Sequence, residues 1–240
     1  MKREKAQKER GVPTKRLRIV RMEIPEMDEM IEAERDAHLK AAYTQMRDGA
    51  KANPEQAEWY AAWKIILRET GEMVGDLCFK GPPDDLTVEI GYGVLEAHRH
   101  KGYAKEAVAA MTDWAFSQGA AYYVRAITDE GSAASERVLE TNGYKKVEQL
   151  PENVALEAGQ TLWEKEKPAT SWMTILMCLG LSIGVAIGLS AFDNAGVGLS
   201  IGLAIGLAMG VALDAQDRAA RKRKQDAPDG ETPERASKKK

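Results

Sequence analysis

A basic corner that contains a glycine, RHKGYAKEA at residues 99–107, has the residue types that bind phosphate. It follows the apolar stretch EIGYGVL and opens into AKEAVAAMTDWAFSQ, whose apolar residues recur at helical spacing. The first N–H groups of a helix have no intrahelical partner and carry the positive end of the helix dipole. Gly102 would let an anion approach the backbone, while Arg99 and Lys101 add full positive charges. The pattern therefore predicts a phosphate or pyrophosphate cradle.

The spacing within this corner leaves a second interpretation open. Neither GxxxxGK[ST] nor GxGxxG is present there, and R-x-x-G-x-A alone is also typical of a solvated surface corner. His98 and His100 border the corner and could titrate near neutral pH, or simply face solvent or phosphate. The corner must therefore be judged together with the elements on either side of it.

The flanking segments alternate between strand and helix patterns. RLRIVRM, from Arg16, alternates like a strand, and Pro25 opens a helical region that ends near Gly49. WYAAWKIILRE and MVGDLCF predict an antiparallel hairpin, and LTVEIGYGVL and YYVRAIT predict strands on either side of the helix after the corner. SAASERVLETNGY predicts a shorter helix ended by Gly143, before a last strand pair, YKKVEQL and QTLWEKE. This is the pattern of an α/β or α+β domain that ends near Lys167.

Two motifs in this region resemble the GCN5-related N-acetyltransferases (GNAT). The first is GY-x-V-(x4)-R-x-x-G-Y-A-x-E-A, and the second, after a helix and a strand, is S-x-x-V-L-E-x-x-G-Y. The resemblance spans residues 16–165, is most specific from Glu89 to Tyr144, and is nearest to the branch with ribosomal-protein alanine acetyltransferases. It implies a mixed, mostly antiparallel sheet with flanking helices, and acetyl-CoA as the acetyl donor to a primary amine.

The resemblance also assigns cofactor contacts position by position. Val94 would lie beside the acetyl carbonyl, where its amide could stabilise the oxyanion. Splaying of its strand from YYVRAIT would open the cofactor cleft, and the glycines at 91 and 93 suit an irregular strand end. Ser135 matches the serine of the second motif, and Ser132 stands where the family usually has asparagine. The pyrophosphate would bind at Arg99, His100, Lys101, Gly102, Tyr103 and Ala104.

The groups that would move protons are less well defined. Glu89 is the candidate general base, directly or through water, because some family members carry a carboxylate on this strand; an outward-facing strand residue is the alternative. Leu139 falls where the family often has a tyrosine acid, so the leaving thiolate would need another group or water. Tyr92 could line the cofactor path or pack in the core. No metal is expected, because the three histidines form no ligand pair with a supporting carboxylate motif.

Residues 168–213 differ in kind from the preceding domain. Two uncharged spans, each about one bilayer crossing in length, flank Asp193 and Asn194. A glycine-zipper repeat would let helix backbones approach closely and would allow self-association; its glycines stand at 180, 184, 188, 198, 202, 206 and 210. These features predict a transmembrane helical hairpin in contact with lipid. A buried soluble hairpin or a self-associating appendage is the alternative interpretation.

The distribution of charge gives the remaining expectations. The net charge of the 240 residues is only −3, which provides no global electrostatic case for nucleic acid. Both flanks of the hairpin are basic and its turn is not, so the positive-inside rule predicts a membrane-anchored chain with its catalytic domain and both termini in the cytoplasm. Residues 1–15 and 214–240 are expected to be charged disordered tails, the second after a helical start, and 16–167 the acetyl-CoA-binding domain.

Three functions are compatible with these features. The first is acetyl transfer at the cytoplasmic membrane face to a protein N-terminus, a lysine or a small amine, with the acceptor unspecified. The second is a membrane-tethered acyl-CoA sensor or scaffold without turnover, suggested by Leu139 and Ser132. The third makes the hairpin a toxin or channel-like element, although its uncharged spans offer no polar path for ions.

Overall fold

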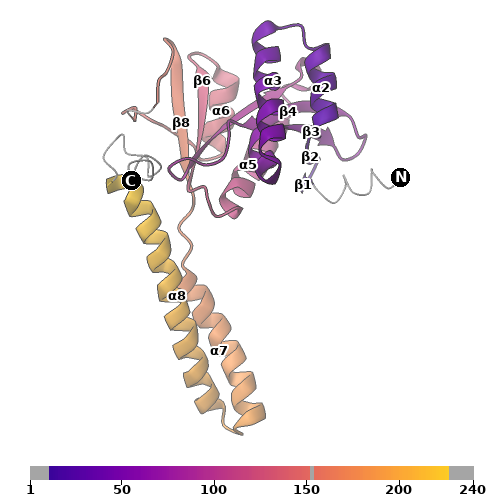
Figure 1. Cartoon of the computed structure of the whole chain (residues 1–240). Helices are drawn as coiled ribbons and strands as arrows, with labels where there is room; N and C mark the ends of the chain where they lie inside the picture. Colours follow the sequence, from indigo (N-terminus) through magenta and orange to yellow (C-terminus); the bar gives the residue numbers. More distant parts are fainter. Residues whose placement is uncertain (1–10, 152–153, 227–240) are drawn as a thin grey trace, which may run out of the picture. The chain divides into compact units, whose positions relative to one another are not determined.

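The computed structural model describes residues 11–151 and 154–226 (Figure 1). The chain forms two compact units, Met1–Lys167 and Pro168–Lys240. Residues 1–10 and 227–240, which the sequence assigns to tails, lie outside the described residues.

The first unit is built on a mixed sheet with the strand order β1-β2-β3-β4-β5-β6-β8-β7. Neighbouring strands are antiparallel except for β5 and β6, which run parallel. The mostly antiparallel sheet expected from the sequence is thereby confirmed. The strands are β1 (Val12–Pro13), β2 (Leu17–Arg21), β3 (Ala62–Leu67), β4 (Met73–Phe79), β5 (Thr87–Val94), β6 (Tyr123–Asp129), β7 (Lys145–Lys146) and β8 (Gln160–Glu166).

Helices cover both faces of this sheet (Figure 1). On one face, α5 (Tyr103–Ser117) and α6 (Ala133–Thr141) bury Val108 and Leu139 in the larger core, together with Ile90 of β5. On the other face, the smaller core contains Met27, Ala50 and other residues of three helices. These helices are α2 (Ile24–Ala33), α3 (Ala37–Ala52) and α4 (Ala57–Tyr60).

Two segments differ from the structure that their sequence predicts. Residues 11–15 were expected to lie in a disordered tail, yet Val12 pairs with Ile19 in β1 and β2. This order comes from long-range bonds, because the hydroxyl of Thr14 donates to Glu106 at 2.6 Å. Trp59 and Tyr60, expected to begin a strand, belong to α4 (Ala57–Tyr60) instead, and Trp59 is buried in the larger core from that helix.

The second unit is a pair of long helices, α7 (Trp172–Ala191) and α8 (Ala195–Asp226). Both are long and apolar enough to cross a membrane, with a mean hydropathy of 2.1 over each apolar window. Asp214 on α8 accepts hydrogen bonds from the first amides of α7, at 2.8 Å from the nitrogen of Trp172. Asn194 accepts from the amide of Gly196 at 3.0 Å and so caps α8. The helix α8 continues past residue 213, where the sequence predicts that the hairpin ends and the charged tail begins.

The glycines of the two helices face one another inside this unit. A Cβ atom added to Gly184 would lie 2.3 Å from the carbonyl oxygen of Gly198, and one on Gly202 would lie 2.0 Å from that of Gly180. Large apolar side chains point outward instead, including Leu189, which is 58% exposed. The glycine strips are therefore used within the chain, and the outer surface of the hairpin is apolar.

A contact between β4 and β5 gives a test of the sheet. A Cβ atom on Gly75 would lie 2.2 Å from the carbonyl oxygen of Gly93, which is backbone and cannot move without disturbing the ladder. We expect Gly75→Ala to lower the free energy of unfolding by about 2–4 kcal/mol. Urea unfolding followed by tryptophan fluorescence measures it. Gly71→Ala is the control, because Gly71 has open space around its Cβ position and only a left-handed backbone to strain, about 1 kcal/mol. Equal losses in both variants would contradict this account.

Candidate active site

The two parallel strands β5 and β6 separate along their length. Their register partners begin with Thr87 and Tyr123 and end with Glu89 and Arg125. Beyond these three pairs, β5 continues against β4 as far as Val94, while β6 continues against β8. The ladder between β5 and β6 therefore ends at Glu89, in keeping with the splaying expected from the sequence, and we call the unpaired stretch between the carboxyl ends of the two strands the cleft.

The backbone of β5 points alternately toward β4 and into this cleft. The Leu95 amide donates to the Val74 carbonyl at 2.9 Å, and the Lys80 amide donates to the Glu89 carbonyl at 3.0 Å. In an antiparallel ladder, every second residue directs its N–H and C=O groups to the partner strand, and the residues between them direct theirs away. The odd-numbered residues of β5 thus face β4. The N–H group of Val94 points to the other side, into the space between β5 and β6.

The corner after β5 turns through two left-handed residues. The backbone φ angles are 60° at His100 and 77° at Gly102, which is the N-cap of α5. The helix begins at Tyr103, one residue before the helical segment AKEAVAAMTDWAFSQ that the sequence predicts. Its first N–H groups point out of the helix end toward this loop, where the dipole adds positive charge.

Two cationic side chains fold over the backbone of the same loop. Arg99 Nε lies 3.4 Å from the Val94 carbonyl oxygen, and Lys101 Nζ donates to the Ala97 carbonyl at 3.2 Å. Both side chains are exposed, as is His100. Full charges and helix amides are therefore gathered at one end of α5, which suits a pyrophosphate group.

Arg16, which the sequence places only at the start of a strand, holds this loop in position. Its Nη1 donates to the Lys101 carbonyl at 2.8 Å, and its Nε donates to the Glu106 carboxylate at 2.7 Å. The guanidinium carbon also lies 4.9 Å from the centre of the Tyr103 ring. The contacts join residues 85 or more apart in the chain, so no local pattern could have revealed them.

The helix α6 brings the second motif to the cleft. Ser132 is its N-cap, and the Ser135 carbonyl accepts a hydrogen bond from the Tyr92 hydroxyl at 3.2 Å. Burial raises the pKa of Tyr92 to about 12, although that hydrogen bond acts in the opposite direction. Leu139 is completely buried in the core. Tyr92 therefore connects β5 with α6, while α6 presents an apolar residue at the position expected for a tyrosine acid.

Glu89, the candidate base, lies at the last residue pair before the strands separate. It forms an ion pair with Lys80, and its side chain is 26% exposed. Five residues of extended strand separate it from Val94, a span of roughly 16 Å. Its role as a base stays a prediction, since the described contacts place it beside a cation at the closed end of the cleft.

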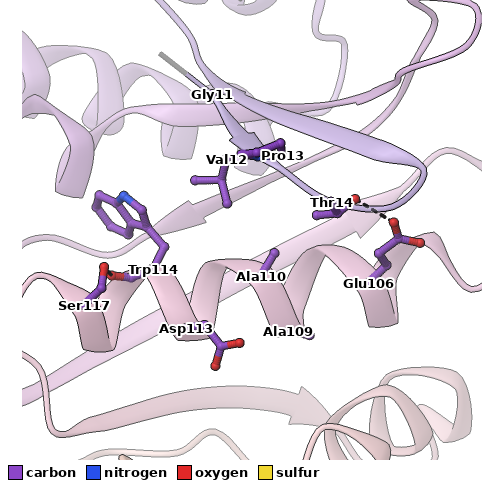
Figure 2. A pocket seen from close by; sticks show the side chains of 10 residues that line it. All are labelled: Gly11, Val12, Pro13, Thr14, Glu106, Ala109, Ala110, Asp113, Trp114 and Ser117. Atoms are coloured by element: carbon purple, nitrogen blue, oxygen red, sulfur yellow. Dashed lines mark hydrogen bonds between the residues drawn. The ribbon is translucent and has the colours of Figure 1, made fainter. Parts of the chain in front are cut away.

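A separate groove lies between α5 and the first strand (Figure 2). The hydrogen bond from Thr14 to Glu106 closes one end of it, and Trp114 lies toward the other. Residues of β5, β6 and α6 do not contribute to its lining, so this groove is distinct from the cleft. Its lining residues are Gly11, Val12, Pro13, Thr14, Glu106, Ala109, Ala110, Asp113, Trp114 and Ser117.

Comparison with known proteins identifies the family. A family model for the acetyltransferase (GNAT) domain matches residues 16–145. The chain therefore belongs to the GNAT family, whose fold and paired motifs it carries.

Among curated relatives, the uncharacterized N-acetyltransferase YjdG of Bacillus subtilis is 31% identical over 86 residues, 35% of this chain and 51% of that protein. The uncharacterized N-acetyltransferase YnaD of the same organism is 24% identical over 140 residues, 56% of this chain and 82% of that protein. The chain thus spans about half the length of the first relative.

Solved structures share the fold at low sequence identity. An acetyltransferase from Agrobacterium tumefaciens is 20% identical with a TM-score of 0.51, over 65% of this chain and 94% of that chain. The ribosomal L7/L12 alpha-N-protein acetyltransferase RimL, in complex with coenzyme A, is 14% identical with a TM-score of 0.51, over 65% of this chain and 97% of that chain. These likenesses establish the GNAT fold for the first unit.

The contact between Arg16 and Glu106 leads to a test with a defined pH dependence. Burial alone would raise the pKa of Glu106, but hydrogen bonds from Thr14 and from the amide and guanidinium of Arg16 outweigh it and lower the pKa. The stabilisation is therefore present above the ordinary pKa of glutamate, and is lost as the pH falls through the lowered value. We expect Glu106→Gln to reduce stability by about 1–2 kcal/mol at neutral pH, and the deficit to shrink in acid.

Thermal unfolding of wild type and Glu106→Gln across the acid range measures this difference. Glu69→Gln, at an exposed turn residue, is the matched control and should behave as wild type. A deficit that does not change with pH would show that the charge of Glu106 has no part in holding the loop.

Proposed function

We propose that the first unit catalyses acetyl transfer from acetyl-CoA to a primary amine. The observation that supports this most is the separation of β5 and β6, with the Val94 amide directed into the opening. An extended donor chain that enters such an opening can pair with the exposed edge of β5, as an added strand would. Membership of the GNAT family supports the same donor.

In this proposal the loop after β5 binds the pyrophosphate of the donor. The amides of Arg99–Ala104 and the side chains of His100 and Lys101 supply the donors and positive charge, and Gly102 leaves room for the phosphates. Ser132 and Ser135 border the donor from α6. Arg16 holds the loop against the first turn of α5 through its hydrogen bonds to the Lys101 carbonyl and the Glu106 carboxylate.

The reaction would proceed by direct attack of the amine on the thioester carbonyl. A carbon–nitrogen bond forms, and the carbonyl oxygen gains a negative charge that the Val94 amide stabilises. The carbon–sulfur bond then breaks and the thiolate of coenzyme A takes a proton. The protein's main contribution is to hold the two reactants together in the cleft. Glu89 is a candidate for removing the amine proton.

The acceptor belongs to one of three chemical classes: a protein N-terminus, a lysine side chain or a small amine. RimL acts on the α-amino group of ribosomal L7/L12. That acceptor class is therefore the first to test with this chain, ahead of lysine peptides and small amines.

Binding of acetyl-CoA provides the first test. We expect Gly102→Val to weaken acetyl-CoA binding at least tenfold in calorimetry, because the side chain would fill the space that the phosphates need. Gly119→Val is the control for the left-handed backbone: Gly119 has a φ of 79°, close to the 77° of Gly102, and follows the other end of α5; a Cβ on Gly102 would lie in ordinary contact, 3.4 Å, with Nη2 of Arg16, and one on Gly119 in open space. Equal affinities in the two variants would contradict the cradle, and no binding by wild type would contradict the function. Tight binding without turnover of any amine class would instead indicate a sensor, a function favoured by Leu139.

We also propose that the second unit anchors the protein in a membrane, with the first unit and both termini in the cytoplasm. The hairpin exposes its apolar side chains and buries its glycines, the reverse of a helix pair that is stable in water. Ile183 and Met209, for example, are 50% and 55% exposed. Basic residues at both ends of the hairpin support this orientation. Acetylation would then be confined to acceptors near the membrane surface.

Membrane fractionation tests the anchor. We expect the full chain to sediment with membranes and to resist carbonate extraction, because two apolar spans would have to leave the bilayer together. A chain that ends at Lys167, the last residue of the first compact unit, should stay in the supernatant. Release of the full chain by carbonate would remove this proposal and leave the acetyltransferase proposal untouched.

A further inference from the structure

On the sheet face covered by α2 and α3, three register partners form a row across the strands. Lys64 of β3 pairs with Asp76 of β4, which pairs with Gly93 of β5. Lys64 forms an ion pair with Glu26 of α2. The Asp76 carboxylate accepts a hydrogen bond at 3.1 Å from the hydroxyl of Tyr43 on α3. Gly93, the last residue of the row, directly precedes Val94, whose amide points into the cleft.

The Asp76 carboxylate lies over bare backbone at the end of this row. A Cβ atom on Gly93 would be 3.8 Å from its Oδ1 atom, and Gly91, the next residue of β5 on this face, also lacks a side chain. No side chain of these two β5 residues therefore stands between the carboxylate and the backbone beside the cleft. Burial raises the pKa of Asp76, the Tyr43 hydrogen bond lowers it, and the charge of Glu34 raises it further.

The direction from which the acceptor arrives follows from the position of the donor. The proposed phosphate loop leads into α5, so the body of acetyl-CoA would occupy the face that α5 and α6 cover. That leaves the opposite face for the amine. On that face, the carboxylate of Asp76 lies opposite Gly93, the residue directly before Val94.

We infer that Asp76, held by Tyr43, receives the ammonium group of the acceptor and removes one of its protons. This rests on the proposed acetyltransferase function. The free amine then attacks the acetyl carbon, and collapse of the tetrahedral intermediate breaks the carbon–sulfur bond. The nitrogen's second proton goes to the departing thiolate, and Asp76 releases the first to solvent. Glu89, by comparison, is paired with Lys80 and lies four residues, roughly 13 Å, back along β5 from Gly93.

The charges around Asp76 favour a cationic acceptor. Lys64, the strand partner of Asp76, is paired with Glu26, which leaves the Asp76 and Glu34 carboxylates to attract an ammonium group. The titratable groups around Asp76 are Glu26, Glu34, Tyr43, Lys64 and Cys78, and the Lys80–Glu89 pair lies farther along β4 and β5.

Two coenzyme A thioethers of nearly equal size test this without knowledge of the acceptor. S-(2-aminoethyl)-coenzyme A places an ammonium group one carbon beyond the position of the attacking nitrogen, and S-propyl-coenzyme A replaces it with a methyl group. In calorimetry with the full chain, we expect the ammonium analogue to bind about tenfold tighter to wild type. Asp76→Asn should abolish that preference while it leaves the affinity for the propyl analogue unchanged. The control Asp48→Asn, on the exposed side of α3, should keep the preference.

The pH dependence of the same preference separates charge from structure. As the pH falls, Asp76 becomes protonated and the preference should disappear, at a higher pH than for an exposed aspartate because burial raises the pKa. Tyr43→Phe removes a bond that lowers the pKa of Asp76, so it should move this loss to still higher pH. This variant keeps the carboxylate, and it tests the inference even if Asp76→Asn proves unstable in thermal unfolding.

The outcomes are distinguishable. A preference that persists in Asp76→Asn, or that is lost in Glu89→Gln instead, would overturn the inference and leave the acetyltransferase proposal standing. Absence of any preference in wild type would also overturn it. Failure of wild type to bind either analogue would refute the donor site, and with it both proposals.

Discussion

The short pairing between β5 and β6 is the constraint on which the rest of the first unit depends. Parallel strands buried in a sheet normally satisfy one another's backbone groups along their whole length. Here only three residue pairs are made before the strands diverge, so the backbone of β5 turns its cleft-facing groups toward an opening. The left-handed corner, the helix end and the motif on α6 are all arranged around that opening.

Residues from the start of the chain complete this arrangement. Thr14 and Arg16 reach the first turn of α5 and fasten it to Glu106 and to the Lys101 carbonyl. His100 is a non-glycine residue in the left-handed region, a conformation that costs free energy and persists only where the surrounding structure fixes it. The tie to the first strands explains why residues 11–15 are ordered, and it couples the proposed phosphate loop to the edge of the sheet.

The second unit follows a different physical rule from the first. Its glycines are inside and its large apolar side chains are outside, because contacts between the helix backbones are made wherever a Cβ atom is missing. In the first unit, by contrast, large apolar residues such as Phe79 and Met111 are buried. This difference between the two outer surfaces is the physical basis of the proposed membrane anchor.

The sequence by itself determined the mixed sheet, the start of α5 near Tyr103 and the glycine repeat of the hairpin, because each depends on periodicity or on a local motif. The resemblance to the family also predicted that this strand would splay from YYVRAIT, and the register between β5 and β6 does end at Glu89. Only the tertiary structure revealed Arg16 as the tie to Glu106 and brought Asp76 of β4 beside Gly93 under Tyr43 of α3. These contacts join residues that are far apart in the chain, through sheet register and helix packing, and no local pattern encodes such distances.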